Sequence, residues 1–126
     1  MNNADIYRVI IAGSQSFADY KRLSKKMDFL LSNIDEDICI IGGEARGASA
    51  LGKQYATDRK YQYRGFPAKW DAYEKRAGYL RNAEMADNAD ALVAFWDGIS
   101  KGTKHMIEIA TAKGLAVRVI RFKPAP

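Results

Sequence analysis

Three short apolar runs are each followed directly by glycine, and this arrangement constrains the fold more than any other feature of the chain. The three runs are Tyr7–Ala12, Ile38–Ile41 and Ala91–Trp96. The glycines that follow them are Gly13, the pair Gly42-Gly43, and Gly98 after one aspartate. Short apolar runs that end in turn residues are typical of strands buried on both faces. The pattern therefore predicts three central strands, each running into a tight turn.

The segments between these strands show the spacing of amphipathic helices. Asp19 is a predicted N-cap for a helix in which apolar residues recur at intervals of three and four up to Ile34. Further helices are predicted through Ala48 and Tyr55, from Trp70 to about Asp87 with a break at Gly78 left open, and from Thr103 to Lys113. Two weaker strands complete the pattern. They are Tyr61–Ala68, whose glycine and proline favour a sheet edge or an early end of the strand, and Leu115–Phe122.

Alternating strands and helices predict crossover connections and a mostly parallel sheet. We therefore expect an α/β fold, a Rossmann-like three-layer sandwich whose sheet has about five strands. A chain of 126 residues suits one core better than two, so residues 1–126 are expected to form a single domain.

Composition excludes several protein classes. Hydrophobic residues make up 48% and charged residues 28%, as in ordinary globular proteins. The apolar runs are too short to cross a membrane, and the polar start, Met1–Asp5, does not resemble a secretory signal. We expect a cytoplasmic protein without membrane contact.

Cys39, the lone cysteine, is interpreted as a strand residue. No cluster of histidine or cysteine suggests a metal site.

The net charge of +5 leaves two interpretations open. A basic surface attracts nucleic acid. Alternatively, scattered lysines solvate the helices while a few arginines bind a small anion. The second interpretation is favoured because no basic run is longer than two residues.

The glycine turns should meet at the carboxyl edge of the sheet, where open α/β sheets bind ligands. Glycine lets backbone amides approach a phosphate, and the helix behind each turn adds unpaired N–H groups. The candidate ligand-binding residues are Gly13, Ser14, Gln15, Ser16, Gly42, Gly43, Arg46, Gly47, Arg81, Asn82, Asp97, Gly98, Ser100, Lys101, Gly102 and Thr103. No turn matches the Walker loop or the GxGxxG fingerprint, which disfavours a nucleoside triphosphatase or dehydrogenase, and no cofactor is expected.

Residues that carry catalytic chemistry are sparse. Arg81 suits a bidentate phosphate contact, or else forms a surface ion pair with Glu84. Glu44, Glu84 and Asp97 are carboxylates that would assist hydrolysis if they lay together. His105 is either a general acid or base, or a bystander, and the second interpretation is favoured. Trp70 and Trp96 are expected in the core rather than as platforms for base stacking.

Five stretches together resemble a known family. They are Ile10–Asp19, Gly42–Leu51, Phe66–Trp70, Ala77–Met85 and Ala94–Glu108. They resemble the YspA-like branch of the SLOG superfamily, Rossmann-like domains related to the LOG and DprA proteins of phages and bacteria. Arg81-Asn82-x-x-Met85, combined with the segment from Ser100 to Glu108, is the most specific part. The resemblance implies a pocket for a nucleotide or a nucleotide derivative.

The related LOG enzymes are phosphoribohydrolases, which cleave the N-glycosidic bond of nucleoside monophosphates. Their Arg-Lys-x-x-Met motif is similar to residues 81–85. Their catalytic glutamate, however, follows a Gly-Thr pair at places where this chain has His105 and Met106, and the next acid is Glu108. The YspA-like branch usually has arginine where Gln15 stands and aspartate where Ser49 stands. These departures imply a changed ligand or weakened catalysis.

Three functions follow from these observations. The first is a sensor or sequestering module for a nucleotide-derived small molecule. The second is an N-glycosidic hydrolase in which Arg81 holds phosphate and Glu44, Glu84 or Asp97 assists. The third is a nucleic-acid-associated protein, by kinship with DprA, which is not favoured. Related proteins often form homodimers, and Tyr61, Tyr63 and Tyr79 are candidates for such an interface, although the sequence leaves the oligomeric state open.

Overall fold

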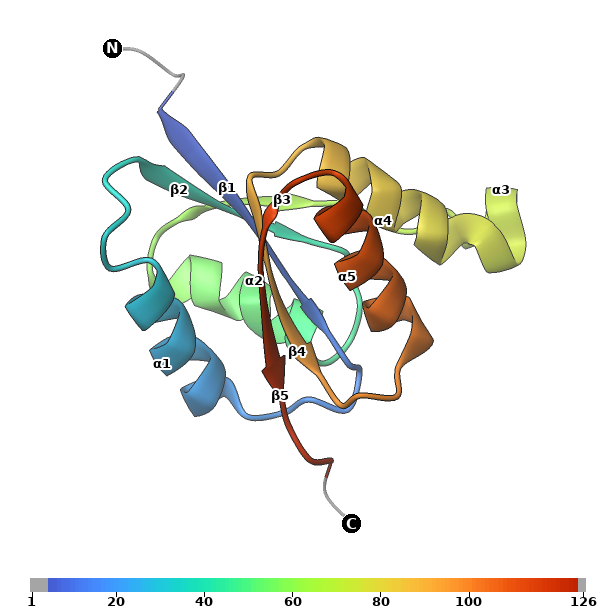
Figure 1. Cartoon of the computed structure of the whole chain (residues 1–126), viewed down its shortest axis with the longest axis horizontal. Helices are drawn as coiled ribbons and strands as arrows, with labels where there is room; N and C mark the ends of the chain where they lie inside the picture. Colours follow the sequence, from blue (N-terminus) through green and yellow to red (C-terminus); the bar gives the residue numbers. More distant parts are fainter. Residues whose placement is uncertain (1–4, 125–126) are drawn as a thin grey trace.

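A computed structural model describes residues 5–124 of the chain. The polar start, Met1–Asp5, which is not expected to be a secretory signal, therefore lies outside the described residues except for Asp5. The centre of the molecule is a sheet of five strands in the order β3-β2-β1-β4-β5, and every neighbouring pair is parallel (Figure 1). The strands are β1 (Ile6–Gly13), β2 (Asp37–Gly42), β3 (Gln62–Gly65), β4 (Ala91–Trp96) and β5 (Ala116–Arg121). The predicted α/β, Rossmann-like fold is confirmed, with a sheet that is entirely parallel.

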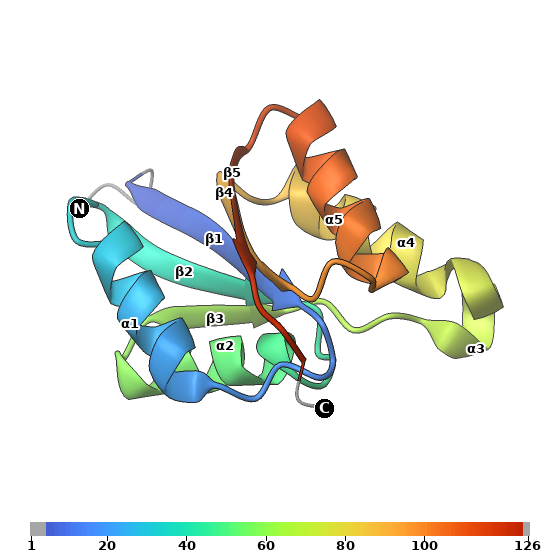
Figure 2. The same cartoon turned by 60° about the horizontal axis from the view of Figure 1, so that its bottom comes forward.

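Helices cover both faces of the sheet (Figures 1 and 2). They are α1 (Tyr20–Leu30), α2 (Ala48–Asp58), α3 (Trp70–Tyr73), the 3₁₀ turn η1 (Glu74–Arg76), α4 (Ala77–Asp87) and α5 (Lys101–Ala112). Helices α1 and α2 lie on one face, and α4 and α5 pack together on the other. Figure 2 shows α3 at the outer end of α4, beyond the edge of the sheet.

Each face of the sheet carries its own apolar core, because strand side chains alternate between the two faces. On β1, Val9 and Ile11 pack toward α1 and α2, whereas Ile10 packs toward α4 and α5. All three side chains are almost completely buried. The three most apolar strands, β2, β1 and β4, lie at the centre of the sheet as predicted, and β3 lies at an edge.

Several local expectations are corrected by the structure. The helix predicted from Trp70 is interrupted by η1, where Glu74 has a left-handed φ of 52°, and Gly78 stays inside α4. Helix α1 ends at Leu30, although Ile34 still packs against the core. Trp70 was expected in the core but is 59% exposed, because α3 projects beyond the sheet. Tyr61 and Tyr63, which the sequence suggested for a homodimer interface, are half-buried against the core of this chain.

Candidate functional site

A cavity of about 410 Å³ lies at the carboxyl ends of β1 and β4. The chain runs outward from β1 through β2 to β3 and then returns to β4 on the other side of β1, so strand order reverses here. Ligands of open α/β sheets bind at such switch points. We call this space the inner cavity. Its lining residues are Ala12, Gly13, Ser14, Gln15, Ser16, Gly43, Ala45, Ser49, Arg81, Asn82, Met85, Asp97, Ser100, Gly102, Thr103 and Met106.

Ser14, Asp97 and Ser100 form a hydrogen-bonded network that joins the turns after β1 and β4. The buried Ser14 hydroxyl accepts a bond from the backbone N–H of Asp97 at 3.1 Å and lies 3.0 Å from the Ser100 hydroxyl. The Ser100 hydroxyl is also 2.9 Å from Oδ2 of Asp97. Asp97 Oδ1 accepts backbone N–H bonds from Ile99 and Ser100, each at 2.8 Å. This network fixes the turn that leads into α5.

The Asp97 carboxylate is held in its ionised form. Burial raises its pKa, but the backbone N–H groups of Ser100 and Ile99 and the Ser100 hydroxyl lower it by more, to about 2. Hydrogen bonds donated to a carboxylate favour its charged form. Asp97 is therefore a weak base with fixed geometry, better suited to accepting hydroxyl bonds than to removing a proton.

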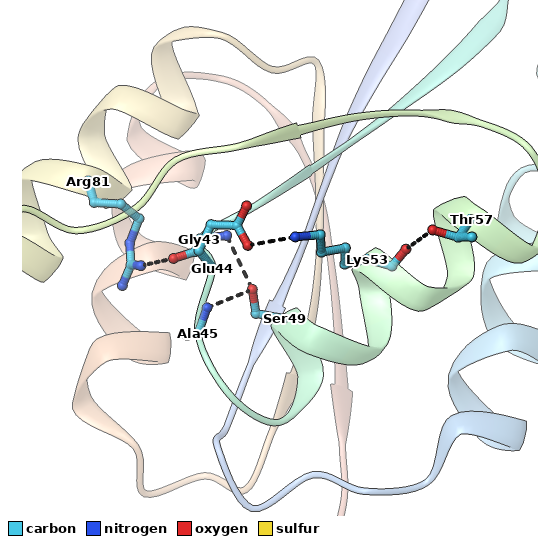
Figure 3. A network of polar contacts seen from close by, with 7 residues as sticks. All are labelled: Gly43, Glu44, Ala45, Ser49, Lys53, Thr57 and Arg81. Atoms are coloured by element: carbon cyan, nitrogen blue, oxygen red, sulfur yellow. Dashed lines mark hydrogen bonds and ion pairs between the residues drawn. The ribbon is translucent and has the colours of Figure 1, made fainter.

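The turn between β2 and α2 contributes Gly43, Ala45 and Ser49 to the lining of the inner cavity. Figure 3 shows the hydrogen bonds of this turn. The Ser49 hydroxyl accepts bonds from the backbone N–H groups of Gly43 at 3.2 Å and Ala45 at 3.4 Å. Ser49 thus fixes the turn by accepting two backbone N–H bonds. Gly47 has a φ of 73°, and a Cβ there would clash with the carbonyl oxygen of Ser14. Only glycine allows the two turns to approach this closely.

Arg81 extends from α4 into the site. Its Nη1 donates to the carbonyl oxygen of Gly43 at 2.5 Å (Figure 3). Its Nε donates to Oδ1 of Asn82 at 3.0 Å. The three ion pairs within residues 5–124 do not include Arg81, so the expected alternative of a pair with Glu84 is wrong. Burial lowers the pKa of the guanidinium. A partly buried cation without a carboxylate partner is costly unless a ligand supplies the negative charge.

Asn82 connects Arg81 to α5. Its amide nitrogen donates to the carbonyl oxygen of Gly102 at 3.2 Å and lies 3.1 Å from Nδ1 of His105. Because the amide oxygen faces Arg81, the nitrogen faces His105, and Nδ1 of that ring is the acceptor. The His105 ring also stacks on Tyr79, with centroids 4.3 Å apart. His105 is half-buried and supports its neighbours without lining the inner cavity.

A second cavity, of about 570 Å³, adjoins the inner one, and we call it the outer cavity. The two share Gln15, Gly43, Ala45, Arg81, Asn82 and Gly102 in their linings. The outer cavity is otherwise lined by Glu44, Arg46, Pro67, Ala68, Trp70, Lys75, Gly78 and Tyr79. Arg81 therefore lies between the two spaces.

The structure brings most of the candidate residues together but separates the two candidate catalytic glutamates. Gly42, Gly47, Gly98 and Lys101 line neither cavity, and the first three shape the turns instead. Glu44 lines the outer cavity and pairs with Lys53 at 3.4 Å. Glu84 is exposed and lines a third cavity, which Tyr73, Arg76 and Arg81 also line. The two glutamates therefore do not share a cavity.

Sequence reasoning missed several residues of the inner cavity. Ser49 gave a signal, since it follows Gly47 at the start of a helix, where a hydroxyl readily binds backbone N–H groups. Met85 and Met106 line the cavity from α4 and α5. Their helical spacing predicts burial, but it does not distinguish a core position from the wall of a cavity.

Two further properties concern residues 5–124 as a whole. No helix in this part of the chain has the length and apolar character needed to span a membrane. Groups of three or more histidine, cysteine, aspartate or glutamate side chains arranged to hold a metal ion are not found among the same residues.

The fold and the site define a Rossmann-like α/β protein with a polar cavity at the switch point of its sheet. The chain belongs to the YspA, cpYpsA-related SLOG family, whose model matches residues 7–73. It is 31% identical over 125 residues to the Gene 61 protein of Mycobacterium phage D29, covering 93% of this chain and 98% of that protein. The family resemblance seen in the sequence is confirmed, and it supports a nucleotide-related binding role in general.

The same fold is found in a solved structure. The X-ray structure of TM1055, a structural genomics target, matches with a TM-score of 0.65 at 18% sequence identity. The match covers 88% of this chain and 72% of the other. At this identity the likeness bears on the fold alone.

Proposed function

We propose that this protein binds a nucleotide or a nucleotide-derived small molecule in the inner cavity, as a sensor or sequestering module. The proposal rests on the environment of Arg81. Its guanidinium is partly buried at the boundary of the two cavities and has no carboxylate partner among the described residues. A phosphate would supply the missing charge and accept hydrogen bonds from the planar donor group.

The first turn of α5 adds donors for the same phosphate. Ser100 is the N-cap of α5, but its hydroxyl bonds Asp97 and Ser14 rather than the helix. The N–H groups of the first turn therefore receive no side-chain cap, and Gly102 and Thr103 line the inner cavity. Such a helix terminus favours an anion through its N–H groups and its dipole.

The polar groups on the sheet side suit a ribose. The ionised Asp97 carboxylate and the hydroxyls of Ser14, Ser16 and Ser100 line the inner cavity. A carboxylate with a low pKa is a stable acceptor for sugar hydroxyls. The volume of the cavity lies within the range of about 300–1,000 Å³ that is usual for small-molecule sites.

The same lining favours binding over hydrolysis. Asp97 is the one carboxylate in the lining of the inner cavity, and its low pKa makes it a poor general base. The buried thioether of Met106 occupies a place where a hydrolase of the LOG type has its acid. Glu44 is paired with Lys53, and Glu84 lines another cavity. We therefore propose a binding protein rather than an N-glycosidic hydrolase.

Calorimetry and thermal unfolding test the proposal. A panel of ribose 5-phosphate, nucleoside monophosphates and nucleoside diphosphates is titrated into the protein. A ligand at 100 times its dissociation constant stabilises the fold by about 2.7 kcal/mol. Arg81→Met keeps the length of the side chain and should weaken binding at least 10-fold. Arg118→Met removes the same charge from exposed β5 and should leave the affinity unchanged.

Two results would contradict the proposal. One is the absence of a thermal shift with every phosphorylated ligand in the panel. The other is equal affinity in Arg81→Met and Arg118→Met, which would leave only generic charge attraction. Chromatography of the incubated ligand separates binding from hydrolysis. We expect intact nucleotide, whereas release of free base that Arg81→Met abolishes would support the hydrolase.

A further inference from the structure

An exposed tryptophan lies beside the cation of the candidate site. Trp70 is 59% exposed at the start of α3 and lines the outer cavity. Gly78 of α4 lies close to both Trp70 and Arg81. A Cβ built on Gly78 would lie 3.4 Å from Cη2 of Trp70 and 3.7 Å from Nη2 of Arg81. The indole ring and the outer edge of the guanidinium therefore flank one narrow space, which a glycine leaves open.

A second aromatic ring lines the same cavity and is held rigidly. Tyr79 is 47% exposed and stacks on His105, and the His105 ring is in turn hydrogen-bonded to Asn82. Asn82 also bonds Arg81. The ring of Tyr79 is thus tied to the guanidinium through two side chains. Two aromatic residues that remain exposed beside a polar cavity are costly to leave in water, and they are typical of a binding surface.

The charge of the outer cavity is predominantly positive. Arg46, Lys75 and Arg81 line it, and none of the three takes part in an ion pair among residues 5–124. Its one carboxylate, Glu44, is paired with Lys53. Aromatic rings interleaved with cations form the surface that binds bases together with phosphates.

We propose that the outer cavity is the base subsite of this protein, in which the nucleobase of a bound nucleotide stacks on Trp70 while its phosphate lies on Arg81. The inference rests on the proposed function and goes further, because it requires a ligand that carries an aromatic base. Ribose phosphates without a base are excluded as full ligands. Stacking accepts any base, so purine and pyrimidine nucleotides should both bind more tightly than the sugar phosphate.

Isothermal titration with AMP, UMP and ribose 5-phosphate tests the inference on the full chain. Base stacking on an aromatic side chain is worth enough that Trp70→Ala should weaken AMP and UMP binding about 5- to 100-fold. The affinity for ribose 5-phosphate should change less than about 2-fold, since Arg81 is untouched. Trp70→Phe should restore part of the nucleotide affinity. Tyr73→Ala, which removes another exposed ring of α3 that lines a different cavity, should have no effect.

The outcomes separate this inference from the function on which it rests. If wild-type protein binds AMP and ribose 5-phosphate equally and Trp70→Ala changes neither, the base subsite is wrong and the phosphate site stands. If Tyr73→Ala weakens AMP binding as much as Trp70→Ala does, the effect comes from α3 in general and the base subsite is again wrong. If wild-type protein binds none of the three ligands, both proposals fail.

Discussion

Replacing Asp97 with asparagine tests the network that shapes the inner cavity. The substitution keeps the size of the side chain and one amide oxygen, which can still accept the N–H bonds of Ile99 and Ser100. It removes the negative charge and places an NH₂ group where Oδ2 lies 2.9 Å from the Ser100 hydroxyl. We expect the fold to remain and the protein to lose stability at neutral pH.

The size of that loss follows from the pKa of the carboxyl. A fall from the ordinary value of 3.8 to about 2 corresponds to about 2.4 kcal/mol of stabilisation. Because the side chain is partly open to solvent, we expect a smaller loss of about 1–2 kcal/mol. The folded-state pKa is lowered, so the carboxylate stabilises the fold above pH 4. This contribution disappears as the pH falls from about 4 to 2.

Urea unfolding of wild-type protein and Asp97→Asn between pH 2 and pH 7 measures this difference. The wild type should be more stable by a constant amount above pH 5, and the two proteins should converge toward pH 2. A loss of about 1–2 kcal/mol corresponds to a melting temperature lower by about 3–8 °C in a protein of this size. A difference in stability that persists at pH 2 would show that the loss comes from packing. Our attribution of the stabilisation to the negative charge of Asp97 would then be wrong.

Three further predictions concern the fold and the surface. Gly47→Ala should destabilise the protein by about 2 kcal/mol or more in urea unfolding, because φ is 73° and the added Cβ would clash with the carbonyl oxygen of Ser14; unchanged stability would contradict this. Tyr55→Phe should cost about 1 kcal/mol, since the buried phenol donates to Asp28 at 2.7 Å. Single-stranded oligonucleotides should bind only through charge, with an affinity no better than about 10⁻⁴ M at physiological salt. Sub-micromolar binding under these conditions in a fluorescence anisotropy assay would reinstate the nucleic-acid alternative.

The arrangement of strands was predictable because it depends on local patterns. The central strands β1, β2 and β4 consist mostly of apolar residues and run into turn residues, and helices separate the strands along the chain. Parallel strands that are joined by helices expose their carboxyl ends at the same edge. Sequence patterns alone therefore sufficed to predict that the three glycine turns lie at one edge of the sheet.

The helix predicted from Trp70 shows where local patterns fail. Apolar residues continue at helical spacing through η1, so no local pattern indicates that Glu74 takes a left-handed conformation. Gly78 was the more obvious place for a break, yet it remains inside α4. The position of the interruption decides where α3 points. Trp70 is consequently exposed beside the outer cavity instead of lying in the core.

The sequence by itself determined the fold class, the edge of the sheet where the turns meet, and the absence of an acid at the places that His105 and Met106 occupy. Only the tertiary structure decided which side chains meet there. The contact between Ser14 and Ser100 joins residues 86 positions apart, and the contact between Arg81 and Gly43 spans 38. Periodicity reports which face of an element is buried. It does not report the distances between elements, and the pairing of each charged group depends on those distances.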